Sequence, residues 1–185
     1  MGGAKRNPSL ASKPPRTAMG CSGALTILQG ICVALLIAAR WCVDPDRVFL
    51  AGHSDGGTSA AALAFLRKLQ ATPRAIVLSA AGVRKQDLEA YACAPPLSVL
   101  VLHSRRDTLF PLPAYGLEAA RWWAACNQCA AVPVAGGAAG CVEFPGCAPG
   151  TRTRYCEGDA PHQAWPGLNA EILGFLANAS AHSQP

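Results

Sequence analysis

Short, almost wholly apolar runs recur along the middle of the chain, and they constrain its fold more than any other feature. They lie at residues 47–51 (RVFLA), 75–79 (AIVLS) and 97–103 (LSVLVLH). Continuous apolar runs of this length are typical of strands buried on both faces of a parallel sheet. A fourth strand is predicted at residues 151–156, close to the end of the chain.

Segments with helical patterns separate these strands. The predicted helices are residues 24–40, 56–70, 113–126 and 168–178. Residues 130–150 are rich in Gly, Pro and Cys and are predicted to form a loop. Strands alternating with helices predict an α/β fold, with a mostly parallel sheet covered by helices on both faces. We expect one domain over residues 23–180, preceded by a disordered basic tail (1–22) and followed by a short tail (181–185).

The apolar segment at residues 24–39 has three interpretations: the hydrophobic region of a secretory signal, a membrane span or a buried helix. It is short for a membrane span, and Gln29 and Gly30 interrupt its middle. The segment also runs directly into Trp41 and Cys42 without a clean cleavage site. A buried helix is therefore favoured and a membrane partner is not expected, while a signal anchor stays open.

Composition and charge narrow the classes of function. The chain is 51% hydrophobic and 15% charged, which is typical of a globular protein. Much of its net charge of +5 comes from the N-terminal tail, at Lys5, Arg6, Lys13 and Arg16. No dense stripe of Lys and Arg follows in the rest of the chain, so the sequence does not favour a nucleic acid as partner.

The chain contains nine cysteines, an unusual number for 185 residues. Five of them fall close together, at Cys126, Cys129, Cys141, Cys147 and Cys156. Disulfides in an oxidising, extracellular compartment are the favoured interpretation, and the odd total leaves at least one thiol free or paired between chains. The alternative is a zinc site at the Cys126-x-x-Cys129 pair, although a second tight pair is missing. A glycosylation sequon at Asn178 is consistent with secretion.

The stretch GHSDGG at residues 52–57 lies between a predicted strand and a predicted helix. Its first five residues fit the pattern G-x-S-x-G, in which a strained turn lifts the serine to the carboxyl edge of a sheet. We expect Ser54 to be that serine, with glycine required at Gly52 and Gly56 to avoid collisions, and with Gly57 completing the turn. The backbone N–H of Asp55, at the start of the helix, would then stabilise negative charge. The alternative is an ordinary glycine-rich turn.

A nucleophilic serine in this setting needs an acid and a base, in the chain order Ser, Asp or Glu, His. Asp107 follows the strand at residues 97–103, which is the expected place for the acid. Asp87 and Glu89 follow the previous strand more loosely and are weaker alternatives.

Four histidines are available as the base. His162 lies in a loop between the last strand and the last helix, where the base is expected. His53 adjoins the serine on a strand, so its side chain should point away from the serine. His103 lies within a strand and His182 in the tail. We therefore predict His162 as the base.

Four segments in order carry a resemblance to a known family. They are VDPDRVFLAGHSDGG (43–57), LSVLVLHSRRDTLFP (97–111), ARWWAACNQC (120–129) and PHQAWPG (161–167). Together they resemble the secreted α/β-hydrolase esterases related to polyhydroxybutyrate depolymerases and feruloyl esterases, over about residues 40–177. The resemblance implies an α/β-hydrolase-type sheet and hydrolysis of polyester or plant cell-wall phenolic esters without cofactor or metal. It also implies Ser54 as nucleophile, Asp107 as acid and His162 as base.

The chain departs from the family pattern in three respects. Ser104 stands where the family has glycine after its histidine, and Pro161 stands where it has glycine before the base. The family's fold begins with several strands, and the loop after one of them supplies a second oxyanion donor. These strands have no counterpart in the roughly 40 residues before the serine turn. A catalytically silent or truncated hydrolase remnant that acts as a binding module is therefore the alternative function.

Overall fold

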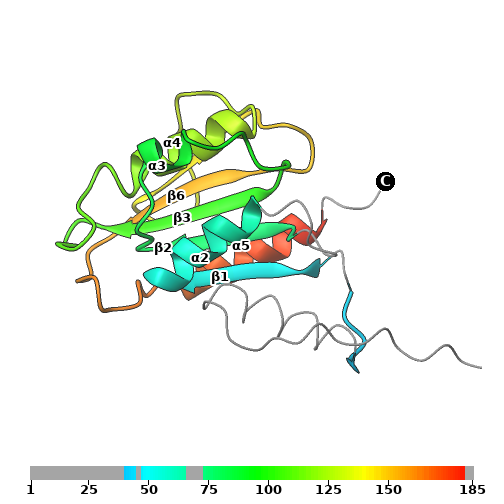
Figure 1. Ribbon diagram of the computed structural model, residues 1–185, viewed down its shortest axis with the longest axis horizontal. Helices are drawn as coiled ribbons and strands as arrows, with labels where there is room; N and C mark the ends of the chain where they lie inside the picture. The colour runs from blue at the N-terminus through cyan, green and yellow to red at the C-terminus, as the bar shows by residue number, and fades with distance from the viewer. Residues whose placement is uncertain (1–39, 45–46, 66–72, 182–185) are drawn as a thin grey trace, which may run out of the picture.

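A six-stranded sheet forms the centre of the protein (Figure 1). The computed structural model describes residues 40–44, 47–65 and 73–181. The strands are β1 (Phe49–His53), β2 (Ala75–Ser79), β3 (Ser98–Ser104), β4 (Val134–Ala135), β5 (Cys141–Phe144) and β6 (Thr153–Gly158). The helices are α2 (Asp55–Ala64), α3 (Lys85–Leu88), α4 (Leu117–Cys126) and α5 (Asn169–Ala181). The predicted α/β class is confirmed.

The sheet is mixed, with the strand order β1-β2-β3-β6-β5-β4. Strands β1, β2, β3 and β6 pair in parallel, whereas β5 runs antiparallel to both β6 and β4. The prediction of a loop throughout residues 130–150 is therefore wrong, because β4 and β5 form a hairpin there. Its strands are two and four residues long, and both residues of β4 are exposed. Such strands carry no buried apolar run by which they could be recognised.

Helices cover both faces of the parallel strands, as predicted. Strands β2 and β3 are buried along their whole length, and their side chains alternate between two apolar clusters. On one face, α2, α3 and α4 pack against the side chains of Ile76, Leu78, Val99 and Val101. On the other face, α5 packs Ile172 and Phe175 against the side chains of Val77, Leu100 and Leu102. In Figure 1, α3 and α4 lie together beside β3 and β6.

Several predicted boundaries shift or lie outside the described residues. Strand β1 begins at Phe49, two residues later than predicted, and α2 begins at Asp55, one residue earlier. The short helix α3 was not predicted. The predicted tail (1–22) and apolar segment (24–39) lie outside the described residues, as do residues 182–185. Among the described helices, none is both long and apolar enough to cross a membrane.

Within the described part of the chain, three disulfides join the predicted cysteine cluster and its surroundings. The pairs are Cys93–Cys126, Cys129–Cys147 and Cys141–Cys156. Cys126 and Cys129 belong to different disulfides, so the disulfide interpretation of the cluster is confirmed over a zinc site. Cys42 is an exposed free thiol. Disulfide bonding of this extent fits an extracellular protein.

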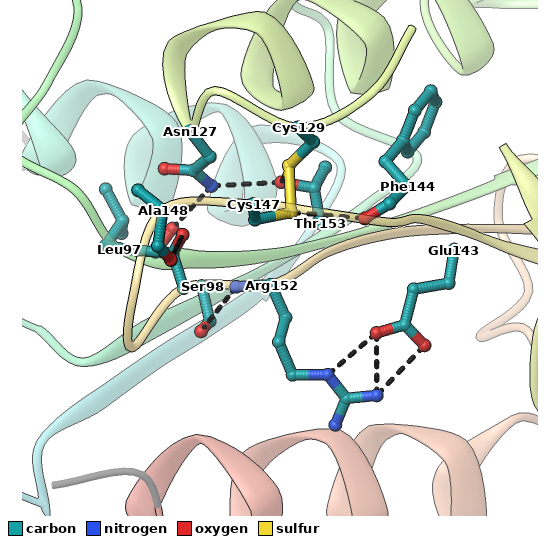
Figure 2. The surroundings of a disulfide bond; sticks show 11 residues. Leu97, Ser98, Asn127, Cys129, Glu143, Phe144, Cys147, Ala148, Arg152 and Thr153 are labelled. Atoms are coloured by element: carbon teal, nitrogen blue, oxygen red, sulfur yellow. Dashed lines mark hydrogen bonds and ion pairs between the residues drawn. A yellow bond between two sulfur atoms is a disulfide. The ribbon is translucent and has the colours of Figure 1, made fainter. Parts of the chain in front are cut away.

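The end of α4 is fixed to the sheet around the Cys129–Cys147 disulfide (Figure 2). The side-chain amide of Asn127 donates to the Leu97 carbonyl oxygen at 2.8 Å and to Thr153 Oγ1 at 2.9 Å. Asn127 and Thr153 are both buried, so these bonds satisfy polar atoms that have little access to water. Helix α4 is thereby attached to the starts of β3 and β6.

Candidate active site

The serine turn joins β1 to α2 at Ser54. This residue has φ 54° and ψ −121°, so its backbone lies in the positive-φ region that non-glycine residues rarely adopt. Its N–H donates to the Ser79 carbonyl oxygen at 2.9 Å, which ties the turn to the end of β2. A Cβ atom at Gly52 would lie 2.2 Å from the carbonyl carbon and oxygen of Gly56. Only glycine at position 52 therefore allows this close approach of strand and helix.

The other two glycines of the turn differ from the prediction in one respect. A Cβ at Gly57 would lie 3.0 Å from the carbonyl oxygens of Gly52 and Ser79, so space is tight there too. A Cβ at Gly56 would meet nothing within 4 Å. The predicted steric need for glycine at position 56 is therefore wrong, because it is the backbone of Gly56, not its missing side chain, that crowds Gly52.

The hydroxyl of Ser54 is hydrogen-bonded to an imidazole from a distant part of the chain. Its Oγ lies 2.8 Å from Nε2 of His162, which is 108 residues further along. His162 belongs to the segment of residues 159–168 between β6 and α5, which we call the base loop. The His162 residue is 8% exposed, so its ring is largely shielded from water.

The second nitrogen of the same imidazole faces a carboxylate. Nδ1 of His162 lies 2.8 Å from Oδ2 of Asp107, whose side chain is fully buried just beyond the end of β3. Oδ1 of Asp107 accepts the backbone N–H groups of Leu109 and Phe110, at 3.0 and 2.8 Å. The structure thus brings together the three side chains that were predicted to form a site.

The surroundings of Asp107 keep it ionised. Burial on its own raises the pKa of this carboxyl, but the hydrogen bonds from Phe110 and His162 and the neighbouring imidazoles outweigh it, so the pKa lies below its usual range. An ionised carboxylate can only accept, so His162 carries its proton on Nδ1. Nε2 is then the acceptor for the Ser54 hydroxyl, which is the arrangement that a general base requires.

The remaining candidates have other partners. His103 is buried beside Asp107, where its Nε2–H donates to the Phe110 carbonyl oxygen at 2.6 Å. Burial lowers the pKa of His103, against the opposing effect of that bond and of the Asp107 charge. Asp87 and Glu89 form exposed ion pairs with Arg84 and Lys85, within and beside the short helix α3. His182 lies outside the described residues.

Aromatic side chains around the imidazole were not predicted as part of the site. The Phe110 ring meets His162 edge-on, with centroids 5.0 Å apart, and it also contacts the ring of Tyr115. Trp165 is 43% exposed, and its ring lies 5.8 Å from that of His53. These residues lie in loops or turns, where no periodic pattern marks them, and only their closeness in sequence to Asp107 and His162 could have indicated them.

The described residues contain no group of three or more His, Cys, Asp or Glu side chains arranged to hold a metal ion. In comparisons with known proteins, no family model matched the chain and no curated protein matched it. The family suggested by the four sequence segments therefore stays a prediction. The structure itself provides an α/β fold with serine, imidazole and carboxylate joined in one hydrogen-bonded series.

Proposed function

We propose that the protein is a serine hydrolase that cleaves carboxylic esters. The observation that carries this proposal is the series of two 2.8 Å hydrogen bonds from Ser54 Oγ through His162 to Asp107. The positive φ of Ser54 also supports the proposal, because backbone strain of this kind is concentrated at functional sites. The order Ser, Asp, His along the chain is that of the α/β hydrolases.

In the proposed reaction, Ser54 Oγ attacks the ester carbonyl carbon while its proton moves to Nε2 of His162. The ionised Asp107 stabilises the imidazolium that forms, and the N–H of Asp55 stabilises the oxyanion. The imidazolium then gives its proton to the departing alcohol, which leaves an acyl group on Ser54. Water attacks this acyl group with His162 again as base, and release of the acid restores the serine hydroxyl.

The proposal extends to the substrate class of the enzyme and to the compartment in which it acts. The sequence resemblance points to esters of the polyester or plant cell-wall phenolic class. The exposed apolar side chains of Leu109 and Trp165, in the segments that carry Asp107 and His162, are compatible with an apolar acyl group or polymer surface. The three disulfides favour an extracellular site of action.

A fluorophosphonate probe tests the proposal, because it reacts with activated serines. We expect one adduct on Ser54, located by mass spectrometry, and hydrolysis of p-nitrophenyl acetate. Ser54→Ala should abolish both, whereas Ser59→Ala, five residues along α2, should retain both. Labelling at another serine, or no labelling of the folded protein, would contradict the proposal and favour the silent binding module.

A further inference from the structure

The base loop is attached to the sheet at two backbone carbonyls, one on each side of Pro161. Oγ of Ser104, the last residue of β3, donates to the carbonyl oxygen of Ala160 at 2.5 Å. Nε2 of His53, the last residue of β1, donates to the carbonyl oxygen of His162 at 2.7 Å. Neither side chain belongs to the proposed reaction. Both nevertheless bind the main chain of the base loop, Ser104 at Ala160 and His53 at His162, where the position of the His162 imidazole is set.

The contacts of His53 show which of its ring nitrogens donates to the base loop. A carbonyl oxygen can only accept, so Nε2 of His53 must carry a proton. Its Nδ1 lies 2.9 Å from Oγ of Ser79, a fully buried hydroxyl at the end of β2 that can donate to it. Both ring nitrogens of His53 thus have hydrogen-bond partners. His53, which directly precedes Ser54 in the sequence, therefore fixes the main chain of His162.

Ser104 and Pro161 are the two residues that differ from the pattern of the family that the sequence resembles. In the structure, both lie where the base loop is bonded to the end of β3. The Ser104 side chain is buried, and its hydroxyl holds the carbonyl directly before Pro161. The proline ring fixes φ at that position, and the Pro161 carbonyl accepts the N–H of Ala164 at 3.0 Å. A glycine at either position would supply neither the hydroxyl nor the fixed dihedral angle.

We propose that His53 and Ser104 are positioning residues that jointly set the place of the His162 imidazole. The inference rests on the proposed function. The ring must reach Ser54 and Asp107 at once, and these come from two different strand ends. A displacement of about 1 Å in such a site can cost roughly 100-fold in rate. Holding the loop from β1 and from β3 ties it to the strands that present the serine and the acid.

Paired variants test the proposal by enzyme kinetics. His53→Leu and Ser104→Ala remove the two donors, whereas His53→Gln and Ser104→Thr retain a donor near each place. Thr151→Val is the matched control, because it removes a hydroxyl-to-carbonyl bond of 2.7 Å at the opposite end of β6. The quantities measured are KM for p-nitrophenyl acetate and kcat per active site titrated with the fluorophosphonate.

We expect each donor-removing variant to lower kcat per titrated site by about 10- to 100-fold with KM little changed. The Gln and Thr variants should recover most of kcat, and the double variant should lose less than the product of the single losses. The proposal is overturned if kcat per titrated site stays within about threefold of the wild type, or if Thr151→Val lowers it equally.

A second measurement separates this inference from the proposed function. The Nδ1 proton of His162, bonded to Asp107, can be followed by proton NMR whether or not the protein turns over an ester. Loss of this resonance in His53→Leu and Ser104→Ala, with retention in Thr151→Val, supports the positioning role. Retention in all three overturns it. Absence of Ser54 labelling in the wild type contradicts only the proposed function.

Discussion

Two imidazoles and a carboxylate are buried within a few ångströms of one another at the end of β3. Nε2 of His103 lies 3.5 Å from Oδ2 of Asp107, the same oxygen that accepts the proton of His162. The Nε2–H of His103 donates a hydrogen bond to the Phe110 carbonyl oxygen, and the Phe110 N–H in turn donates to Asp107 Oδ1. Neutral His103 thus fixes the turn that holds Asp107, and the Asp107 carboxylate keeps its hydrogen bond to His162.

The buried state of His103 predicts a dependence of stability on pH. Burial lowers the pKa of His103 in the folded protein below the ordinary value of about 6.5. As pH falls below about 6.5, the unfolded chain therefore binds this proton first. The contribution of neutral His103 is complete above that pH and is lost as pH falls toward the folded pKa, by up to about 1.4 kcal/mol per pH unit.

His103→Gln should remove this contribution to the slope, whatever its effect on absolute stability. We expect the free energy of unfolding in urea to fall less steeply between about pH 6.5 and pH 5 in the variant than in the wild type. The charged and titratable groups that face His103, namely Asp107, Glu157 and His162, are present in both proteins. Equal slopes would show that burial does not hold His103 neutral.

At the scale of elements, the junction of β1 and α2 depends on one close backbone approach. Gly52→Ala places a Cβ 2.2 Å from the backbone of Gly56, which only a shift of strand or helix can relieve. We expect it to lower the free energy of unfolding by about 3 kcal/mol, the upper end of ordinary overpacking. Chemical denaturation measures this loss, and fluorophosphonate labelling of Ser54 should slow with it.

Gly56→Ala is the matched control for that junction. Its Cβ would enter open space in the first turn of α2, where alanine is a better helix former than glycine. The variant should be as stable as the wild type, or more stable by roughly 0.5–1 kcal/mol. A large loss at position 56 together with a small one at position 52 would contradict this description of the turn.

The strands that the sequence could predict most clearly are those whose apolar side chains are buried. Strands β2 and β3 are buried throughout and stand out as apolar runs. The short, exposed β4 and the four-residue β5, whose middle is half-buried, do not. The three residues of the proposed site could be chosen by chain order and by their places after strands. The bonds of His53 and Ser104 to the base loop could not, because they depend on the path of that loop in three dimensions.

At the scale of the whole molecule, the hairpin side of the sheet is held together by cross-links and ion pairs. The Cys141–Cys156 disulfide joins β5 to β6 within the apolar cluster beneath α5. Glu143 of β5 accepts from Arg152 and Arg154, as Figure 2 shows for Arg152, and Arg154 also reaches Glu171 of α5 at 3.0 Å. Because α5 follows the base loop, these contacts anchor the segment that carries His162.

Removing the buried disulfide should therefore cost stability that removing the exposed thiol does not. The double variant Cys141→Ala, Cys156→Ala frees a loop with a sequence separation of 15 residues, and a cross-link of this size contributes about 3 kcal/mol. Cys42→Ser alters an exposed, unpaired side chain and should change the free energy of unfolding by no more than about 0.5 kcal/mol. Urea unfolding without reductant measures both. If the double variant matched Cys42→Ser, the hairpin would owe its stability to the ion pairs and apolar packing alone.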